Sequence, residues 1–217
     1  MKTPALTSRQ AVTLVGGGPV APGDLDWAIT QAPRLAAADG GAETLLAAGL
    51  MPEIVIGDLD SLSPDTRARI PRGNLQEVTE QDSTDFEKCL TRIAAPLVIG
   101  LGFLGGRVDH TLAALACLAR VGAPCLLLGP DDVAFAAPPR LQIDLSPGTR
   151  VSLFPMRLTR GRSTGLRWPI EGLTLDPGGR IGTSNEATGP IQLEAEGLIV
   201  LLPRSERDAA VRALLRR

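Results

Sequence analysis

The sequence predicts an α/β N-terminal domain with a parallel sheet, followed by a C-terminal antiparallel β-sandwich domain. Short apolar runs alternate with helical segments through about residue 135, which is typical of a parallel sheet covered by helices. From about residue 141, Pro and Gly recur at short intervals and the apolar runs become brief. The 217 residues are 44% hydrophobic, enough to bury a sizeable core. We therefore expect domains at residues 1–138 and 139–217.

The first domain is expected to carry alternating strands and helices in a Rossmann-like order. Strands are expected at residues 11–15, 35–38, 54–56, 97–101 and 125–128, and helices near residues 25–31, 42–48, 84–93 and 111–120. The helix at 84–93 has local support, because Thr84 and Glu87 have the spacing of a capping box. Phe86, Leu90 and Ile93 recur on one face of that helix. Phe86 is therefore expected to point into the core.

The second domain is expected to be built from short antiparallel strands, sandwich or barrel-like. Partial period-two alternation predicts strands at residues 151–154, 173–175, 191–193 and 198–202. The chain then ends in a predicted helix over residues 205–217, with Ala210, Val211 and Leu214 on one face.

Composition and charge exclude several classes of partner. The net charge is −2, the basic residues are spread along the chain, and aromatic residues make up only 3%. A nucleic-acid surface and an anionic-membrane surface are therefore not expected. Cys89, Cys117 and Cys125 lack C-x-x-C spacing and are expected to be buried thiols. Because no apolar run has the length of a signal peptide or a membrane span, a cytoplasmic location is the default expectation.

Acidic side chains follow several of the predicted strands. Asp39 follows the second strand, Asp58 and Asp60 follow the third, and Arg107 with Asp109 follows a later one. Ligands of open parallel sheets gather at the carboxyl ends of the strands, so these residues are expected on one rim. Carboxylates so placed repel each other unless a cation lies between them, and hard oxygen ligands suit Mg²⁺. Because Mg²⁺ fills its shell with water and phosphate oxygens, a phosphate substrate is expected as well.

The acidic segments differ in how specific they are. In an extended chain, Asp58 and Asp60 point to the same side and can bring two carboxylates to one metal. The alternative is that this segment is a surface turn. Residues from Gln81 to Asp85 place donors and acceptors at a helix start, where simple capping is the alternative. Lys88, three residues after Asp85, either belongs to the site or is only an exposed partner of Asp85.

Two glycine-containing segments complete the candidate site. Gly40 and Gly41 let backbone N–H groups approach a phosphate or a base edge, although a tight turn with a capping Asp has the same pattern. Arg107 can grip phosphate in a fork, and Asp109 can hold a metal. His110 beside them is expected to stabilise the turn and not to act in catalysis.

In their order, four motifs resemble the motif series of thiamine pyrophosphokinases. They are Ala-Asp-Gly-Gly-Ala at 38–42, Gly-Asp-Leu-Asp-Ser at 57–61, Gln-Asp-Ser-Thr-Asp-Phe-Glu-Lys at 81–88, and Gly-Gly-Arg-Val-Asp-His at 105–110. Residues 182–186 resemble the family's C-terminal Ser-Asn motif, and residues 164–168 resemble its T-x-G-L-x-[WY] stretch. Glu43 and Glu80 depart from the family pattern at motif edges.

The resemblance implies a homodimer whose active site lies where the α/β domain of one subunit meets the β domain of the other. It also implies the reaction of ATP with thiamine to give AMP and thiamine diphosphate. By match of motif, Asp58, Asp60 and Asp85 hold Mg²⁺ and ATP phosphates, and Arg107 and Asp109 complete the transfer site. The implied ATP contacts are Asp39, Gly40, Gly41, Gln81, Thr84 and Lys88. Ser184 and Asn185 are implied to hold thiamine, with Trp168 contributing.

The expected mechanism is an in-line attack of the thiamine hydroxyl on the β-phosphorus of ATP, with Asp85 or Asp109 accepting the proton. The nearest alternative is a pyrophosphokinase acting on another hydroxyalkyl heterocycle. A metal-dependent hydrolase or glycosyltransferase built on an Asp-x-Asp pair is a second alternative. The third is a non-catalytic thiamine- or nucleotide-binding sensor that kept the fold.

Overall fold

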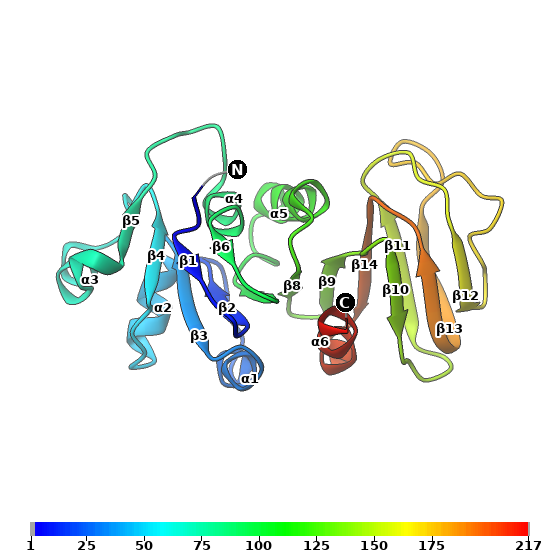
Figure 1. Ribbon diagram of the computed structural model, residues 1–217, viewed down its shortest axis with the longest axis horizontal. Coiled ribbons are helices and arrows are strands. Elements are labelled where there is room, and N and C mark those ends of the chain that lie inside the picture. The colour runs from blue at the N-terminus through cyan, green and yellow to red at the C-terminus, as the bar shows by residue number, and fades with distance from the viewer. Residues whose placement is uncertain (1–2, 217) are drawn as a thin grey trace. The chain divides into compact units, whose positions relative to one another are not determined.

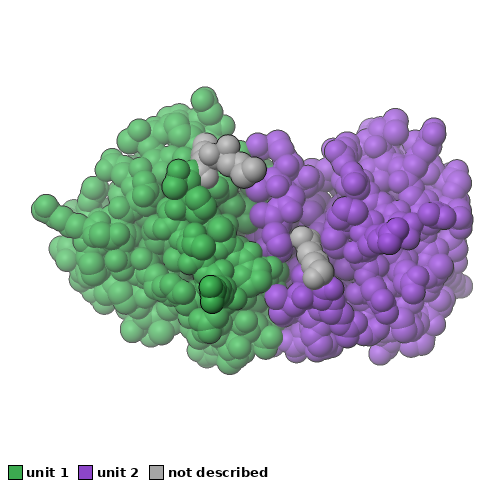
Figure 2. Space-filling model, viewed as in Figure 1, with its two compact units in different colours: residues 1–117 green, residues 118–217 purple. Residues whose placement is uncertain are grey.

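The computed structural model describes residues 3–216, and these fall into two compact units that divide between residues 117 and 118 (Figure 2). The division falls inside helix α5 (Val108–Val121). Met1, Lys2 and Arg217, which belong to the predicted domains and the predicted terminal helix, lie outside the described residues. Within residues 3–216, no helix combines the length and the apolar composition that crossing a membrane requires.

The first unit carries parallel strands. β3 (Arg34–Ala38), β4 (Ile54–Gly57) and β5 (Leu75–Glu77) pair in parallel, and β2 (Val12–Val15) pairs in parallel with β7 (Val98–Leu101). β2 and β4 are buried along their whole length, as in a sheet covered on both faces. A separate short parallel pair joins β1 (Leu6–Thr7) to β6 (Ile93–Ala94). The parallel character of this region is therefore confirmed, and Figure 1 shows β2, β3 and β4 side by side.

Helices cover these strands. α2 (Gly41–Ala47) packs on β2 and β3, α4 (Asp85–Leu90) packs on β3 and β4, and α1 (Asp24–Gln31) contacts β7. The sequence did not predict β5, α3 (Pro64–Arg69) or the 3₁₀ turn η1 (Arg72–Asn74). These elements are short, and their apolar content is too low to show a period.

The helix predicted at 84–93 is shorter than expected. α4 spans only Asp85–Leu90, because the chain enters strand β6 at Ile93. Its start agrees with the prediction, since the Thr84 side chain accepts a hydrogen bond from the Glu87 N–H at 3.3 Å. Phe86 is buried as predicted and lies 4.6 Å from Phe103 between ring centroids.

The second unit is antiparallel in all of the strand pairs that its described residues form. β8 (Cys125–Leu128) pairs with β9 (Asp132–Ala136), β9 with β14 (Leu198–Pro203), and β14 with β11 (Arg150–Pro155). β13 (Gly182–Glu194) pairs with β11 and also with β10 (Arg140–Ile143) and β12 (Arg162–Leu166). The antiparallel β region is confirmed, while its arrangement as a sandwich stays a prediction.

Two details of the second unit differ from the sequence-based expectation. The strand predicted at 173–175 is wrong, because this segment makes only an isolated bridge between Leu175 and Thr159. The terminal helix α6 (Arg207–Leu215) follows a 3₁₀ turn, η2 (Arg204–Glu206), and buries Ala210, Val211 and Leu214 as predicted. All three cysteines are buried thiols outside any disulfide, also as predicted.

Candidate active site

Three carboxylates meet at the carboxyl end of the parallel strands. Asp39 follows β3, and Asp58 and Asp60 follow β4; one carboxylate oxygen from each lies within 4.8 Å of the others. β3 and β4 are parallel neighbours, so their carboxyl ends open at the same edge. The pairing of these two strands therefore brings together residues that lie about twenty positions apart in the sequence.

An unusual backbone shapes this acidic cluster of Asp39, Asp58 and Asp60. Asp39 and Leu59 have positive φ angles of 43° and 64°. Such conformations cost non-glycine residues about 1 kcal/mol or more, and they cluster at functional sites. The Leu59 side chain is only 3% exposed, which anchors the turn between the two aspartates. A Cβ at Gly57 would lie 2.9 Å from the Asp39 Cβ, so only glycine leaves room for Asp39.

The Asp39 carboxylate has an unsatisfied oxygen. Asp39 is 4% exposed, and its Oδ1 is a buried atom for which residues 3–216 provide no hydrogen-bond partner. A buried acceptor without a partner is costly, and a cation would satisfy it. Three carboxylates with one orphaned oxygen therefore fit a hard divalent cation such as Mg²⁺, which takes oxygen ligands.

Lys88 links Asp85 to the acidic cluster. Its side chain is 2% exposed, and its Nζ lies 3.1 Å from Asp85 Oδ1 and 3.6 Å from Asp58 Oδ2. Gln81 donates from Nε2 to Asp58 Oδ2 at 3.4 Å. Lys88 is thus a buried partner of Asp58 and Asp85 and not an exposed one, and its contact with ATP stays a prediction. Asp85, expected beside Asp58 and Asp60 as a metal ligand, is joined to Asp58 through the ammonium, and its role as a ligand stays a prediction.

The charges shift the pKa values of these groups. Burial by itself raises the pKa of Asp58, but hydrogen bonds from Asp60 and Gln81 and the charge of Lys88 hold that pKa below its usual value. Burial raises the pKa of Asp85 despite the hydrogen bond from Lys88. For Lys88, burial lowers the pKa, and the bond to Asp85 with the charge of Asp58 more than offsets it. The ammonium therefore stays charged inside the site.

Two glutamates that looked like departures from the family pattern hold the loops around the cluster. Glu43 on α2 accepts a hydrogen bond from the Ser63 N–H at 3.2 Å and one from Thr66 Oγ1 at 3.4 Å. Glu80 accepts bonds from the N–H groups of Asp82 and Ser83 at 3.0 and 3.2 Å. Single-sequence reasoning could not assign the role of Glu43, because its partners lie about twenty residues away, whereas the partners of Glu80 are local.

Gly41 is needed for close packing at the start of α2. A Cβ placed on it would lie 2.0 Å from the Val15 carbonyl oxygen. The N–H groups of Ala42 and Glu43 already bond to the carbonyl oxygens of Asp39 and Gly40. The tight-turn reading of this segment is therefore supported, and its contact with nucleotide stays a prediction.

Arg107 and Asp109 pair with each other. The guanidinium donates from Nε to Asp109 Oδ1 at 3.1 Å and from Nη2 to Oδ2 at 2.6 Å, and both side chains are exposed. The pKa of Asp109 is lowered to about 2, first by these bonds and then by a bond from the His110 N–H. His110 thus supports the turn through its backbone.

The ion pair between Arg107 and Asp109 leads to a prediction about the titration of Asp109 and the pH dependence of stability. The Asp109 carboxyl should titrate near 2, and Arg107→Gln should return its midpoint toward the ordinary value of 3.8. Because the folded-state pKa is the lower one, the pair stabilises the fold above about pH 4, and this contribution is lost as the pH falls through about 2. Carboxyl ¹³C NMR measures the midpoint. Arg72→Gln, an exposed arginine on η1, serves as control, and an unshifted midpoint in Arg107→Gln would contradict the pairing.

The remaining candidates lie in the second unit. Ser184 on β13 has a φ of 58°, and its N–H donates to Ser152 Oγ at 3.1 Å. Asn185 is buried, and its side chain forms hydrogen bonds with the backbone of Trp168, a residue that is 55% exposed. Ser184 and Trp168 can therefore meet a ligand directly, whereas the Asn185 side chain is turned to the protein.

Two family models match the chain. The catalytic domain of thiamin pyrophosphokinase matches residues 25–126, and the vitamin B1 binding domain of thiamin pyrophosphokinase matches residues 140–196. Thiamine pyrophosphokinase 1 of Oryza sativa subsp. japonica is 29% identical over 154 residues, covering 62% of this chain and 58% of that protein. Thiamin pyrophosphokinase 1 of Caenorhabditis elegans is 30% identical over 155 residues, covering 63% of each. The chain thus aligns with about three-fifths of each relative.

Solved structures share the fold. The thiamin pyrophosphokinase from Geobacillus thermodenitrificans superposes with a TM-score of 0.73 at 24% identity, covering 92% of this chain and 99% of that one. The yeast enzyme gives a TM-score of 0.72 at 18% identity, covering 96% and 89%. At these identities the likeness shows the fold alone.

Fold and site together define a class: α/β proteins with an acidic cluster at the carboxyl edge of a parallel sheet, followed in the chain by an antiparallel β unit. The two domain models match in chain order and between them span most of the sequence. The chain belongs to the thiamin pyrophosphokinase family.

Proposed function

We propose that this protein transfers the pyrophosphoryl group of ATP to the hydroxyl of thiamine, giving thiamine diphosphate and AMP. Family membership supports the reaction. The acidic cluster of Asp39, Asp58 and Asp60, with its unsatisfied Asp39 oxygen, is the observation that supports assigning this reaction to particular residues. Such a cluster suits a site where cation and phosphate are bound together.

The residues have distinct proposed roles. Asp58, Asp60 and Asp85 would hold Mg²⁺ together with Asp39, and the bound ion would supply charge neutralisation at the phosphate oxygens. The thiamine oxygen forms a bond to the β-phosphorus, and the bond from that phosphorus to the α,β-bridging oxygen breaks, so that AMP leaves. Asp85 or Asp109 accepts the hydroxyl proton. The pKa of Asp109 is lowered to about 2, whereas burial raises the pKa of Asp85, and the higher pKa makes Asp85 the better proton acceptor of the two.

Further contacts are proposed on the same basis. Gly40, Gly41, Gln81, Thr84 and Lys88 would contact ATP, and Arg107 would grip phosphate in the transfer step. Ser184, Asn185 and Trp168 would form the thiamine side of the site. We also propose a homodimer with the active site at the subunit interface, domains at 1–138 and 139–217, and a cytoplasmic location.

The test is direct detection of products. Purified protein with ATP, thiamine and Mg²⁺ should yield thiamine diphosphate and AMP in equal amounts by HPLC, and EDTA should abolish both. Release of inorganic phosphate or nucleoside diphosphate in place of AMP would favour a hydrolase or glycosyltransferase. AMP formation only with another hydroxyalkyl heterocycle would identify a pyrophosphokinase of different specificity. Tight thiamine or ATP binding without AMP would indicate a sensor.

A further inference from the structure

The Asn185 carboxamide on β13 holds the backbone of Trp168 from both sides. Its Nδ2 donates to the Trp168 carbonyl oxygen at 2.7 Å, and its Oδ1 accepts from the Trp168 N–H at 3.1 Å. The same Oδ1 accepts from the Glu186 N–H at 2.8 Å. An amide oxygen has two acceptor sites, so this one is saturated. Asn185 is also only 6% exposed. Three of the four hydrogen-bonding sites of the carboxamide are therefore committed to the protein.

The chain on either side of Trp168 is fixed as well. The Arg167 N–H donates to the Glu186 carbonyl oxygen at 2.8 Å, and the Ile170 N–H donates to the buried Ser163 Oγ at 3.0 Å. Gly165 has a φ of 76°, and a Cβ there would lie 2.1 Å from the Pro190 carbonyl oxygen. The loop after β12 is thus pinned to β13 at several points.

Although its backbone is held in this way, Trp168 is 55% exposed. Exposing a large aromatic ring forgoes the favourable burial of its apolar area. The Arg167 guanidinium carbon lies 4.9 Å from the centroid of the Trp168 ring. Arg167 Nη1 forms an ion pair with Glu186 Oε2 at 3.4 Å. One face of the indole is therefore covered by a neutralised guanidinium. A planar aromatic ligand would stack on the other face.

We propose that Asn185 is a positioning residue that acts through Trp168 and does not bind substrate itself. It orients the indole so that the planar heterocycle of the substrate can stack on the ring. This inference rests on the proposed function for the identity of the ligand. It assigns separate roles to the two residues of the Ser184-Asn185 pair, since Ser184 faces solvent and Asn185 faces the protein.

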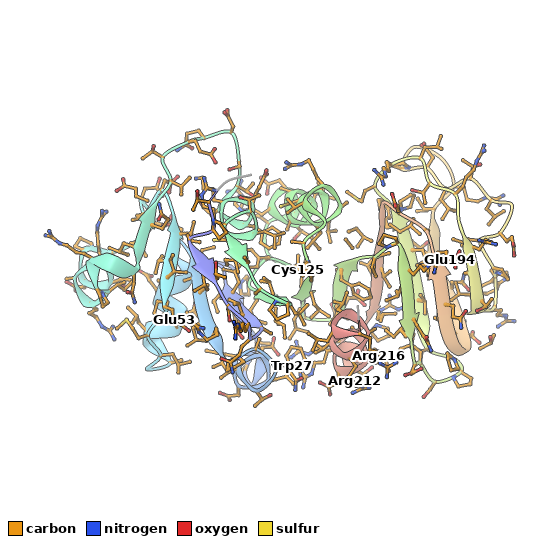
Figure 3. All side chains as sticks on the ribbon, viewed as in Figure 1. Trp27, Glu53, Cys125, Glu194, Arg212 and Arg216 are labelled. Carbon is orange, nitrogen blue, oxygen red and sulfur yellow. The ribbon has the colours of Figure 1, made fainter. Side chains whose placement is uncertain are left out.

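Fluorescence separates this role from a general structural one. The chain has two tryptophans, and Trp27 lies on α1 (Figure 3), so a Trp27→Phe background reports Trp168 alone. In that background, Asn185→Asp should lower the fluorescence anisotropy of Trp168, because the Nδ2 donor facing the Trp168 carbonyl is replaced by an acceptor. Gln192→Glu makes the same chemical change at an exposed position of β13 and should leave the anisotropy unchanged.

Kinetics test whether Asn185 acts through Trp168. Asn185→Asp should raise the KM for thiamine roughly tenfold, as for one lost buried hydrogen bond, with kcat and the KM for ATP changed less than about twofold. On a Trp168→Ala background, the same substitution should add less than about twofold. Independent, additive losses would overturn the proposal, because they would mean that Asn185 contacts substrate itself.

Two further outcomes are distinguishable. If Asn185→Asp fails to fold by circular dichroism, Asn185→Ser removes the same donor without adding a charge and takes its place. If the parent protein forms no thiamine diphosphate, the proposed function fails, while a lowered Trp168 anisotropy would still support the positioning role. Unchanged anisotropy in a folded Asn185 variant would overturn that role whatever the activity.

Discussion

Asp60→Asn is expected to lower turnover by roughly a hundredfold or more while leaving the fold intact. Asp60 is exposed, so the amide buries no unsatisfied group. Its carboxylate contributes one of the three clustered oxygens, and loss of a charged metal ligand removes several kcal/mol of charge stabilisation from phosphoryl transfer. Steady-state formation of AMP over a range of Mg²⁺ concentrations measures both the turnover and the Mg²⁺ requirement.

The metal-free stability of the Asp60→Asn variant, unlike its turnover, should not fall. Three carboxylates within 4.8 Å repel each other without a cation, so removing one charge should leave metal-free stability unchanged or raise it by up to about 1 kcal/mol. Urea denaturation in EDTA tests this. Asp65→Asn makes the same change on the exposed face of α3 and is the control. Near wild-type activity of Asp60→Asn would refute the assignment of this cluster as the metal site.

Lys88→Met is expected to destabilise the metal-free protein by about 1–3 kcal/mol. The buried ammonium bridges Asp58 and Asp85, and its removal leaves two carboxylates facing each other. Breaking a fully buried pair costs more, but both carboxylates here are partly exposed to solvent, which screens their repulsion. Activity should also fall, because Lys88 lies within the proposed ATP site.

Mg²⁺ should restore much of the stability lost in Lys88→Met. A cation bound at Asp58 supplies the positive charge that the variant lacks, so the stabilisation by Mg²⁺ should be larger in the variant than in the parent. Urea midpoints with EDTA and with Mg²⁺ measure the difference. Arg67→Met, which removes an exposed cation from α3, should show no such dependence. A loss of stability equal in EDTA and Mg²⁺ would mean that Lys88 serves packing alone.

The fold was largely predictable because its signals are local. Buried parallel strands such as β2 and β4 are continuous apolar runs, and the start of α4 is marked by Thr84 and Glu87. The prediction at 173–175 was wrong for the same reason: a short apolar run has no local property that separates a strand from a loop with one bridge. Short, polar elements such as α3 gave too few periodic positions.

For the site, the sequence predicts which residues carry the chemistry, because residue type and spacing can be read directly along the chain, and their roles stay predictions. It placed Asp39, Asp58 and Asp60 on one rim, and the parallel pairing of β3 and β4 brings them together. Only the tertiary structure decided the burial of Lys88 between Asp58 and Asp85, and the turning of Asn185 toward Trp168. Both depend on contacts between segments distant in sequence, and no single-sequence pattern records how such segments pack.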